Sequence, residues 1–208
     1  MKLQEIYSKY LIPENLQLHM MRVAGLAEIL LKSWQGKQVS AEHIVRACLL
    51  HDIAKPINFD LAKQAKWGMT PKDIAALKTL QEQIRSKYGN DEHTVLVALC
   101  RASGIREQTV RIVNNTEWSL TSELLKRNDW ESLIAIYADR RVGPEGLLSL
   151  EERFNDLQKR GVIEDANTVR DFGKKLEQEL SIFLKINPNS VTNEEIEKLF
   201  PVYLSREI

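Results

Sequence analysis

The chain is poor in cysteine, and its two cysteines do not form a pattern used for metal binding or redox chemistry. Cys48 and Cys100 each lie inside apolar helical sequence, outside a CxxC spacing. This spacing argues against a zinc ribbon and against a redox pair. We therefore expect both residues to be buried free thiols.

The chain also lacks long apolar runs and an excess of positive or negative charge. Apolar runs are short, with residues 29–31 and 48–50 as typical examples, whereas a membrane helix needs roughly 20 apolar residues. Residues 1–11 carry scattered charges and have no apolar signal-peptide core, so a cytoplasmic protein is expected. Lys plus Arg number 29 and Asp plus Glu number 29, so no global basic field favours non-specific binding of nucleic acid.

Alternating strand patterns are absent, and the sequence predicts an all-α protein. The chain is 43% hydrophobic and shows no shift in composition, which favours a single domain. Two long charged helices are expected within residues 144–186, and this tail is expected to serve packing rather than chemistry. Apolar spacing, caps and breakers predict the other helices over residues 13–34, 40–55, 70–87, 91–102, 105–114, 130–142 and 191–200.

One of these helices ends in two polar residues that interrupt an apolar run. In "RACLLHDIAKP", residues 46–56, His51 and Asp52 follow core-facing positions, and Pro56 forbids continuation of the helix. A structural explanation is that the histidine donates to the last carbonyls while the aspartate caps the next segment. A chemical explanation is that the imidazole and the carboxylate are two metal ligands.

The remaining histidines help to separate these explanations. His19 and His93 fall on or beside apolar helical faces, where each alone is more often a hydrogen-bonded core residue, whereas His43 is expected to face water without a role. Asp139 ends another apolar helix. Together with the His-Asp pair, His19 and Asp139 make two imidazoles and two carboxylates, which bind a divalent transition metal and leave positions for water and substrate.

The order of these residues resembles a known metal-binding tetrad. His in "LHMMRVAGLAEIL", His-Asp in "LLHDIAKP" and a distant Asp in "IAIYADRRV" resemble the HD-domain superfamily of metal-dependent phosphohydrolases over roughly residues 14–142. The resemblance implies a helical bundle that encloses the ion, with an HD-type core at 1–142 and further helices of the same domain at 143–208. It also implies phosphate-ester substrates, commonly nucleotides. The implied metal ligands are His19, His51, Asp52 and Asp139.

The sequence departs from the binuclear branches of this superfamily. His93 matches one of their additional histidines, but Asn114 and Asn115 stand where a further histidine is expected. Because an amide replaces imidazole poorly on a transition metal, we expect one divalent ion, which could be Mn, Fe, Co, Ni or Zn. His93 would then contact the substrate phosphate or relay a proton, with a core histidine as the alternative.

Three basic residues lie next to the candidate ligands or one helical turn from them, where they could bind a phosphate. Arg22 is three residues after His19, Lys55 is three after Asp52, and Arg140 adjoins Asp139. Arg22, Lys55 and Arg140 are therefore candidate phosphate-binding residues, Lys55 foremost, whereas Arg141 is expected to be a solvated surface cation. Asp52, Lys55 and His93 are the candidate catalytic residues, and Asp52 could also orient the attacking water.

These features leave three interpretations. The first is an enzyme that hydrolyses a nucleotide or another small phosphate ester. The second is an HD-type metal-binding or nucleotide-binding regulatory module without turnover, and the third is a helical interaction protein whose histidines are structural. Metal content separates the third from the others, and a phosphatase screen separates the first two. The sequence leaves substrate identity and oligomeric state open, with a homodimer possible.

Overall fold

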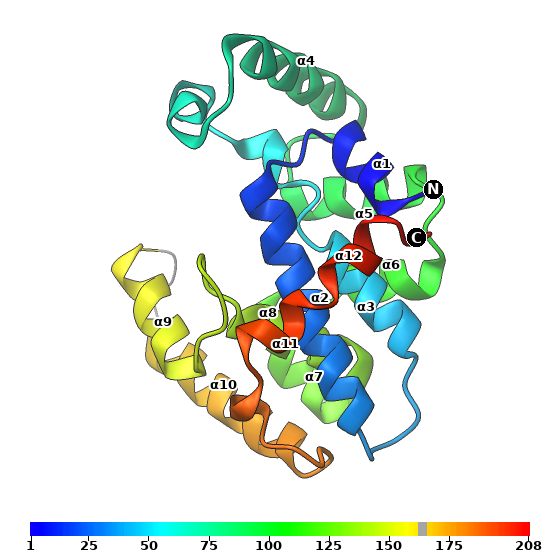
Figure 1. Cartoon of the computed structure of the whole chain (residues 1–208), viewed down its shortest axis with the longest axis vertical. Coiled ribbons are helices and arrows are strands. Elements are labelled where there is room, and N and C mark those ends of the chain that lie inside the picture. Colours follow the sequence, from blue (N-terminus) through cyan, green and yellow to red (C-terminus); the bar gives the residue numbers. More distant parts are fainter. Residues whose placement is uncertain (162–165) are drawn as a thin grey trace.

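The protein is built from helices throughout the part of the chain that the structure describes. The computed structural model describes residues 1–161 and 166–208, without the side chains of residues 166–169. Its described part contains no β-strand, which confirms the all-α prediction (Figure 1). The α-helices are α1 (Leu3–Lys9), α2 (Glu14–Ser33), α3 (Ala41–Leu50), α4 (Pro71–Tyr88), α5 (Glu92–Ala102), α6 (Glu107–Asn114), α7 (Thr121–Arg127), α8 (Trp130–Arg141), α9 (Leu150–Lys159), α10 (Ala166–Ser181), α11 (Asn193–Glu197) and α12 (Phe200–Leu204).

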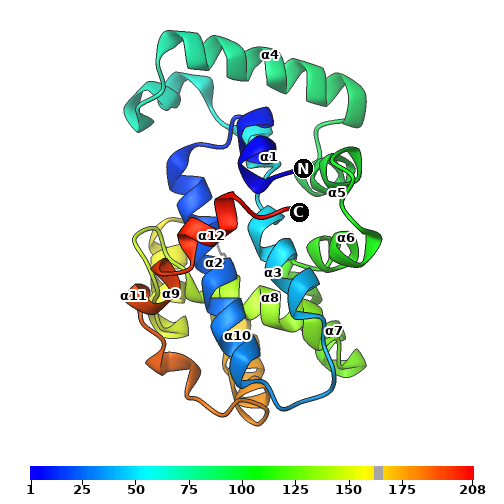
Figure 2. The ribbon, with the colours of Figure 1, turned by 45° about the vertical axis from the view of Figure 1, so that its right-hand side comes forward.

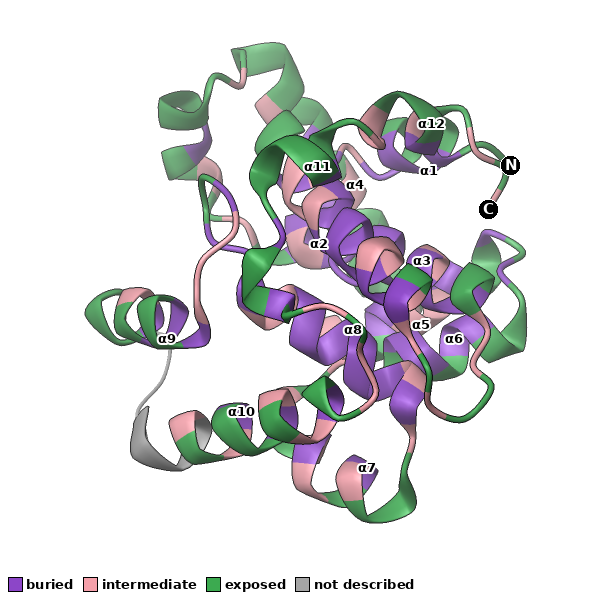
Figure 3. Cartoon of the chain, turned by 60° about the horizontal axis from the view of Figure 1, so that its bottom comes forward, coloured by how far each residue is buried: buried purple, intermediate pink, exposed green. Residues whose placement is uncertain are grey.

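Helices α2, α3 and α8 form the centre of the core. Helix α2 runs beside α3, and α8 packs against both, as Figure 2 shows for the first pair. Most of their apolar side chains are buried, whereas α4, α9 and α10 keep wide exposed faces (Figure 3). Because the central helices bury so much of their surface, the side chains at their ends are fixed by packing on several sides. Both cysteines are buried free thiols, as predicted.

Local signals explain several helix starts. The side chains of Thr70, Asp129 and Thr192 each accept a backbone N–H of the first turn, and Thr70 and Thr192 complete capping boxes, as their sequence context predicts. Ser40 occupies the N-cap position of α3, but its side chain makes no capping bond. Its backbone N–H instead donates to Oε1 of Glu131 at 2.7 Å.

Two other predictions about single side chains are wrong. His43 is buried, with Nδ1 2.7 Å from Oγ1 of Thr109, because α6 packs over the first turn of α3. Arg141 is 3% exposed, and its guanidinium donates to the Tyr137 hydroxyl and to the carbonyl of Pro188. In both cases a helix or loop distant in sequence covers the side chain.

The C-terminal segments return to the centre of the molecule. Helix α11 packs on α2, and the two chain termini lie close together, with the N–H of Ile208 donating to the carbonyl of Met1 at 3.0 Å (Figure 1). Within the described residues, no helix is both long and apolar enough to cross a membrane. The helices α1 and α7 were not predicted from sequence, because seven-residue helices depend on tertiary packing.

Gly25 allows α11 to approach α2, and its replacement should destabilise the protein. A Cβ at Gly25 would lie 2.9 Å from Cβ of Ile196 and 3.2 Å from the Ile196 carbonyl oxygen. Because backbone atoms must move to make room, Gly25→Ala should lower the free energy of unfolding by about 1–3 kcal/mol. Ser86→Ala on the exposed face of α4 is the control. Urea denaturation of both variants would test this, and equal midpoints would contradict the close contact.

Candidate metal centre and its cleft

Three side chains from the central helices meet at one point. His19 comes from α2, His51 follows the last residue of α3, and Asp139 lies in the last turn of α8. Oδ1 of Asp139 is 3.1 Å from Nε2 of His19 and 3.4 Å from Nε2 of His51. One ligand atom from each residue falls within 4.8 Å of the others, which is a spacing that a single metal ion can bridge.

Asp52 lies against the same two imidazoles. Its Oδ2 is 3.7 Å from Nε2 of His19 and 3.6 Å from Nε2 of His51. The same oxygen is 2.7 Å from Nζ of Lys55, which forms the adjoining ion pair. The structure therefore brings together all four residues that the sequence singled out as ligands.

A buried imidazole nitrogen without a partner indicates that this cluster fits a metal ion. Nδ1 of His51 donates to the Cys48 carbonyl at 2.8 Å, which leaves Nε2 as the acceptor. Within the described part of the chain, that Nε2 is buried without a hydrogen-bond partner, and the buried Oδ2 of Asp52 has the Lys55 ammonium beside it. Burial of such atoms is costly unless something binds them. Two imidazole nitrogens and two carboxylates form a donor set suited to a divalent transition metal.

The charges in the cluster are strongly perturbed. Burial disfavours the charged imidazole of His51, but the neighbouring carboxylates of Asp52 and Asp139 raise its pKa to about 9. Burial likewise disfavours ionised Asp139, but the neighbouring imidazoles of His19 and His51 hold the pKa of its carboxyl well below the usual range. Such groups are typical of functional sites.

A cleft of about 1160 Å³ opens onto the cluster. Lys55 and Arg140 line it, as expected for cations that contact a phosphate. Arg22 is missing from the described residues of its wall, and its guanidinium instead reaches Glu197 at 3.4 Å and the Pro144 carbonyl at 3.5 Å. The candidate Arg22 is thus directed to the junction with α11.

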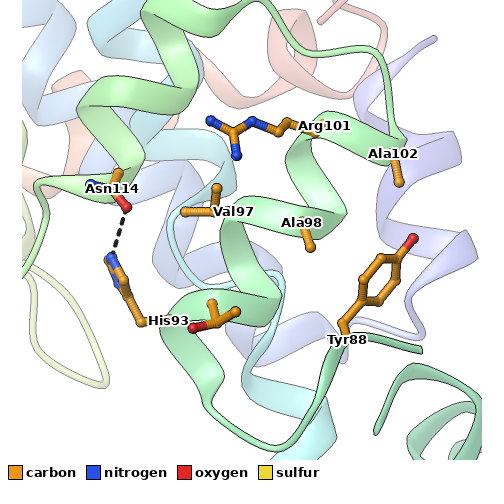
Figure 4. A pocket seen from close by; sticks show the side chains of 8 residues that line it. Tyr88, His93, Val97, Ala98, Arg101, Ala102 and Asn114 are labelled. Carbon is orange, nitrogen blue, oxygen red and sulfur yellow. Dashed lines mark hydrogen bonds between the residues drawn. The ribbon is translucent and has the colours of Figure 1, made fainter. Parts of the chain in front are cut away.

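His93 also lines this cleft and is not a core residue. Its Nε2 lies 3.1 Å from Oδ1 of Asn114, and its Nδ1 lies 3.3 Å from Oε1 of Glu117. Figure 4 shows the contact with Asn114 at the edge of a second hollow of about 550 Å³ along α5. Asn115 points elsewhere, because its amide donates to Asp129 and Ser132 beside the start of α8.

The tail contributes to the cleft, which the sequence did not predict. Arg153, Leu157 and Arg160 of the α9 segment line its wall, so the tail forms part of the cleft, and its expected role in packing rather than chemistry stays a prediction. Phe59, Trp67 and Trp118 add aromatic surface. The spacing of Arg153, Leu157 and Arg160 along one helical face was visible in the sequence, but nothing local indicated which neighbour that face meets.

Comparison with known families agrees with the geometry. Residues 17–139 match the HD domain model, which is more than half of the chain, so the protein belongs to the HD-domain family. Members of this family are generally metal-dependent hydrolases of phosphate esters. The match contains His19, His51 and Asp52 and ends at Asp139, the fourth residue of the cluster. No curated protein and no solved structure matches the chain.

Proposed function

We propose that the protein is a metal-dependent phosphohydrolase that acts on a nucleotide or another small phosphate ester. The observation that carries this proposal is a set of four buried or half-buried side chains at a cleft that also holds Lys55 and Arg140. Three of them, His19, His51 and Asp139, have metal-site spacing, and Oδ2 of Asp52 lies 3.7 Å and 3.6 Å from the two imidazole nitrogens. Membership of the HD-domain family supports the same reaction class.

His19, His51, Asp52 and Asp139 would hold one divalent ion. When bound there, such an ion lowers the pKa of water and polarises a phosphoryl oxygen. The hydrogen bond from His51 to Cys48 supports this role, because it fixes the imidazole with Nε2 facing the cluster.

Lys55 would bind the oxygens of the substrate phosphate. Its side chain is 44% exposed and lines the cleft while its ammonium lies beside Asp52. Burial opposes its charge, but Asp52 raises the pKa of Lys55, so the ammonium persists at neutral pH. Arg140 lines the same cleft next to Asp139 and would offer a guanidinium to the phosphate.

Asp52 and His93 would accept or relay protons during the reaction. Asp52 is close to both imidazoles, so a water molecule held in the cluster would lie within reach of its carboxylate, which can accept a proton. His93 has a side chain that is 29% exposed and can exchange protons with solvent or contact the phosphate.

The contact between His93 and Asn114 also favours a second candidate. Nε2 of His93 is engaged by an amide where binuclear relatives carry another imidazole, as expected if the chain has become an HD-type regulatory module that binds metal or nucleotide without turnover. This candidate differs from the first in turnover alone.

A screen of the full chain across nucleotides and phosphosugars tests the proposal. Reconstitution with Mn, Fe, Co, Ni or Zn should yield phosphate release from at least one ester, and a chelator should abolish it. Metal binding without release from any substrate would favour the regulatory module. Failure to bind any divalent metal would contradict both candidates.

His93→Ala should separate metal binding from turnover. With one ion held by the other four residues, the variant should retain its metal but lose about tenfold to a thousandfold in rate, since a positioned acid or base contributes on that order. Elemental analysis and initial rates would measure this. A fall in metal stoichiometry from two to one would instead indicate a binuclear centre that uses His93.

A further inference from the structure

Helix α9 presents a basic face to the cleft. Arg153, Leu157 and Arg160 are spaced by four and three residues, so they lie on one side of the helix, and all three line the cleft wall. Asp156 lies between the arginines and contacts both, at 2.8 Å from Nη1 of Arg153 and 3.2 Å from Nη1 of Arg160. Among the described residues, one carboxylate therefore pairs with two guanidinium groups.

Arg153 is buried, although its ion pair with Asp156 could form at an exposed surface. Its side chain is 10% exposed, and within the described chain its Nε has no hydrogen-bond partner. Burial lowers the pKa of Arg153. The charge of Asp139 opposes this shift, and the charge of Arg140 adds to it. Arg153 and Arg140 both line this one cleft.

Arg140 also has a guanidinium nitrogen, Nε, without a hydrogen-bond partner among the described groups. Its side chain is 21% exposed, and its Cζ lies 5.3 Å from the Trp118 ring centroid. The nearest carboxylate, Asp139, is 3.9 Å away and would be committed to the metal. Like charges brought together in a partly buried wall repel each other unless an anion lies between them.

We propose that Arg153 and Arg160, together with Arg140, which is shared with the first phosphate, form a second anion subsite, which selects phosphate esters that carry a second phosphate group. The proposal rests on the proposed function, in which the first phosphate occupies the metal centre beside Lys55. Guanidinium groups suit this role because they bind phosphate oxygens through paired N–H donors. Arg153 and Arg160 lie beyond the residues matched by the HD domain model, so this selectivity would belong to the tail of this chain.

Equilibrium binding to the metal-loaded full chain tests the subsite without any turnover. The probes are methylphosphonate, with one phosphoryl group, and alkylenediphosphonates of increasing length, with two. The parent should bind at least one diphosphonate about tenfold or more tightly than methylphosphonate. Arg153→Gln and Arg160→Gln should each reduce this preference toward parity, and their double variant should remove it.

Matched variants separate binding from folding. Arg127→Gln removes an exposed arginine that pairs with Glu123 on α7, so it should keep the parental preference. Arg153→Lys retains the charge and should restore part of what Arg153→Gln loses, at a comparable melting temperature. Arg160 is half exposed, so its variant should fold like the parent.

The outcomes distinguish this proposal from the proposed function. Equal affinity of the parent for both kinds of probe, or a preference that survives the double variant, would overturn the second subsite. A parallel loss for both probes with a lowered melting temperature would assign Arg153 a structural role and also overturn it. If the preference behaves as expected but no ester is hydrolysed, the subsite stands and the phosphohydrolase proposal fails.

Discussion

His51→Ala and Asp139→Ala should each lose the bound metal and, with it, all metal-dependent hydrolysis. Both side chains lie in the cluster where Oδ1 of Asp139 is 3.4 Å from Nε2 of His51. Removal of one ligand leaves too few donors to hold a transition metal tightly, and water cannot replace an imidazole without loss of affinity. Elemental analysis after reconstitution and dialysis would measure the loss.

The same variants should lose stabilisation by metal. An ion that binds only the folded state stabilises it by about 2.7 kcal/mol when its free concentration is a hundred times its Kd. The melting temperature of the parent should therefore rise on addition of metal, and those of the two variants should not. This comparison within each variant cancels any direct effect of the substitution on folding.

His43→Ala is the matched control for these variants. His43 is also buried on α3, but its imidazole contacts Thr109 and does not line the cleft among the described residues. Its replacement should lower stability and leave metal content unchanged. If His51→Ala and Asp139→Ala bind as much metal as the parent, the assignment of the ligands is wrong.

Lys55→Ala should reduce the rate of phosphate-ester hydrolysis about a hundredfold or more while metal content stays the same. The expected loss of transition-state stabilisation is about 2–4 kcal/mol, typical of a preorganised charge removed from a developing anion. An ammonium repels the metal ion, so its removal should not weaken metal binding. Initial rates and metal analysis on one preparation would measure both quantities.

Lys63→Ala provides the control for charge and helix geometry. Lys63 also pairs with an aspartate three residues earlier, with Nζ 3.2 Å from Oδ2 of Asp60, but it is 70% exposed and is not among the cleft residues described. Its variant should behave as the parent. Unchanged turnover in Lys55→Ala would remove Lys55 from the site.

Local sequence signals determined most of the secondary structure and the residue types of the candidate metal centre. Apolar spacing and caps such as Thr70 act within one turn of helix, so they could be recognised without knowledge of the fold. The combination of His19, His51, Asp52 and Asp139 near helix ends or on buried faces, and its resemblance to the HD tetrad, predicted a cluster. The structure brings all four together. Their assignment as metal ligands stays a prediction until metal is measured.

Tertiary structure alone decided which side chains surround that cluster. The order of residues gave no reason for α9 to face the cleft, for Arg22 to turn toward Glu197, or for α6 to cover His43. These contacts join segments that are far apart in the chain, and they depend on how whole helices pack. A helical face is defined by local periodicity, whereas its partner is chosen by the shape and burial of the entire core.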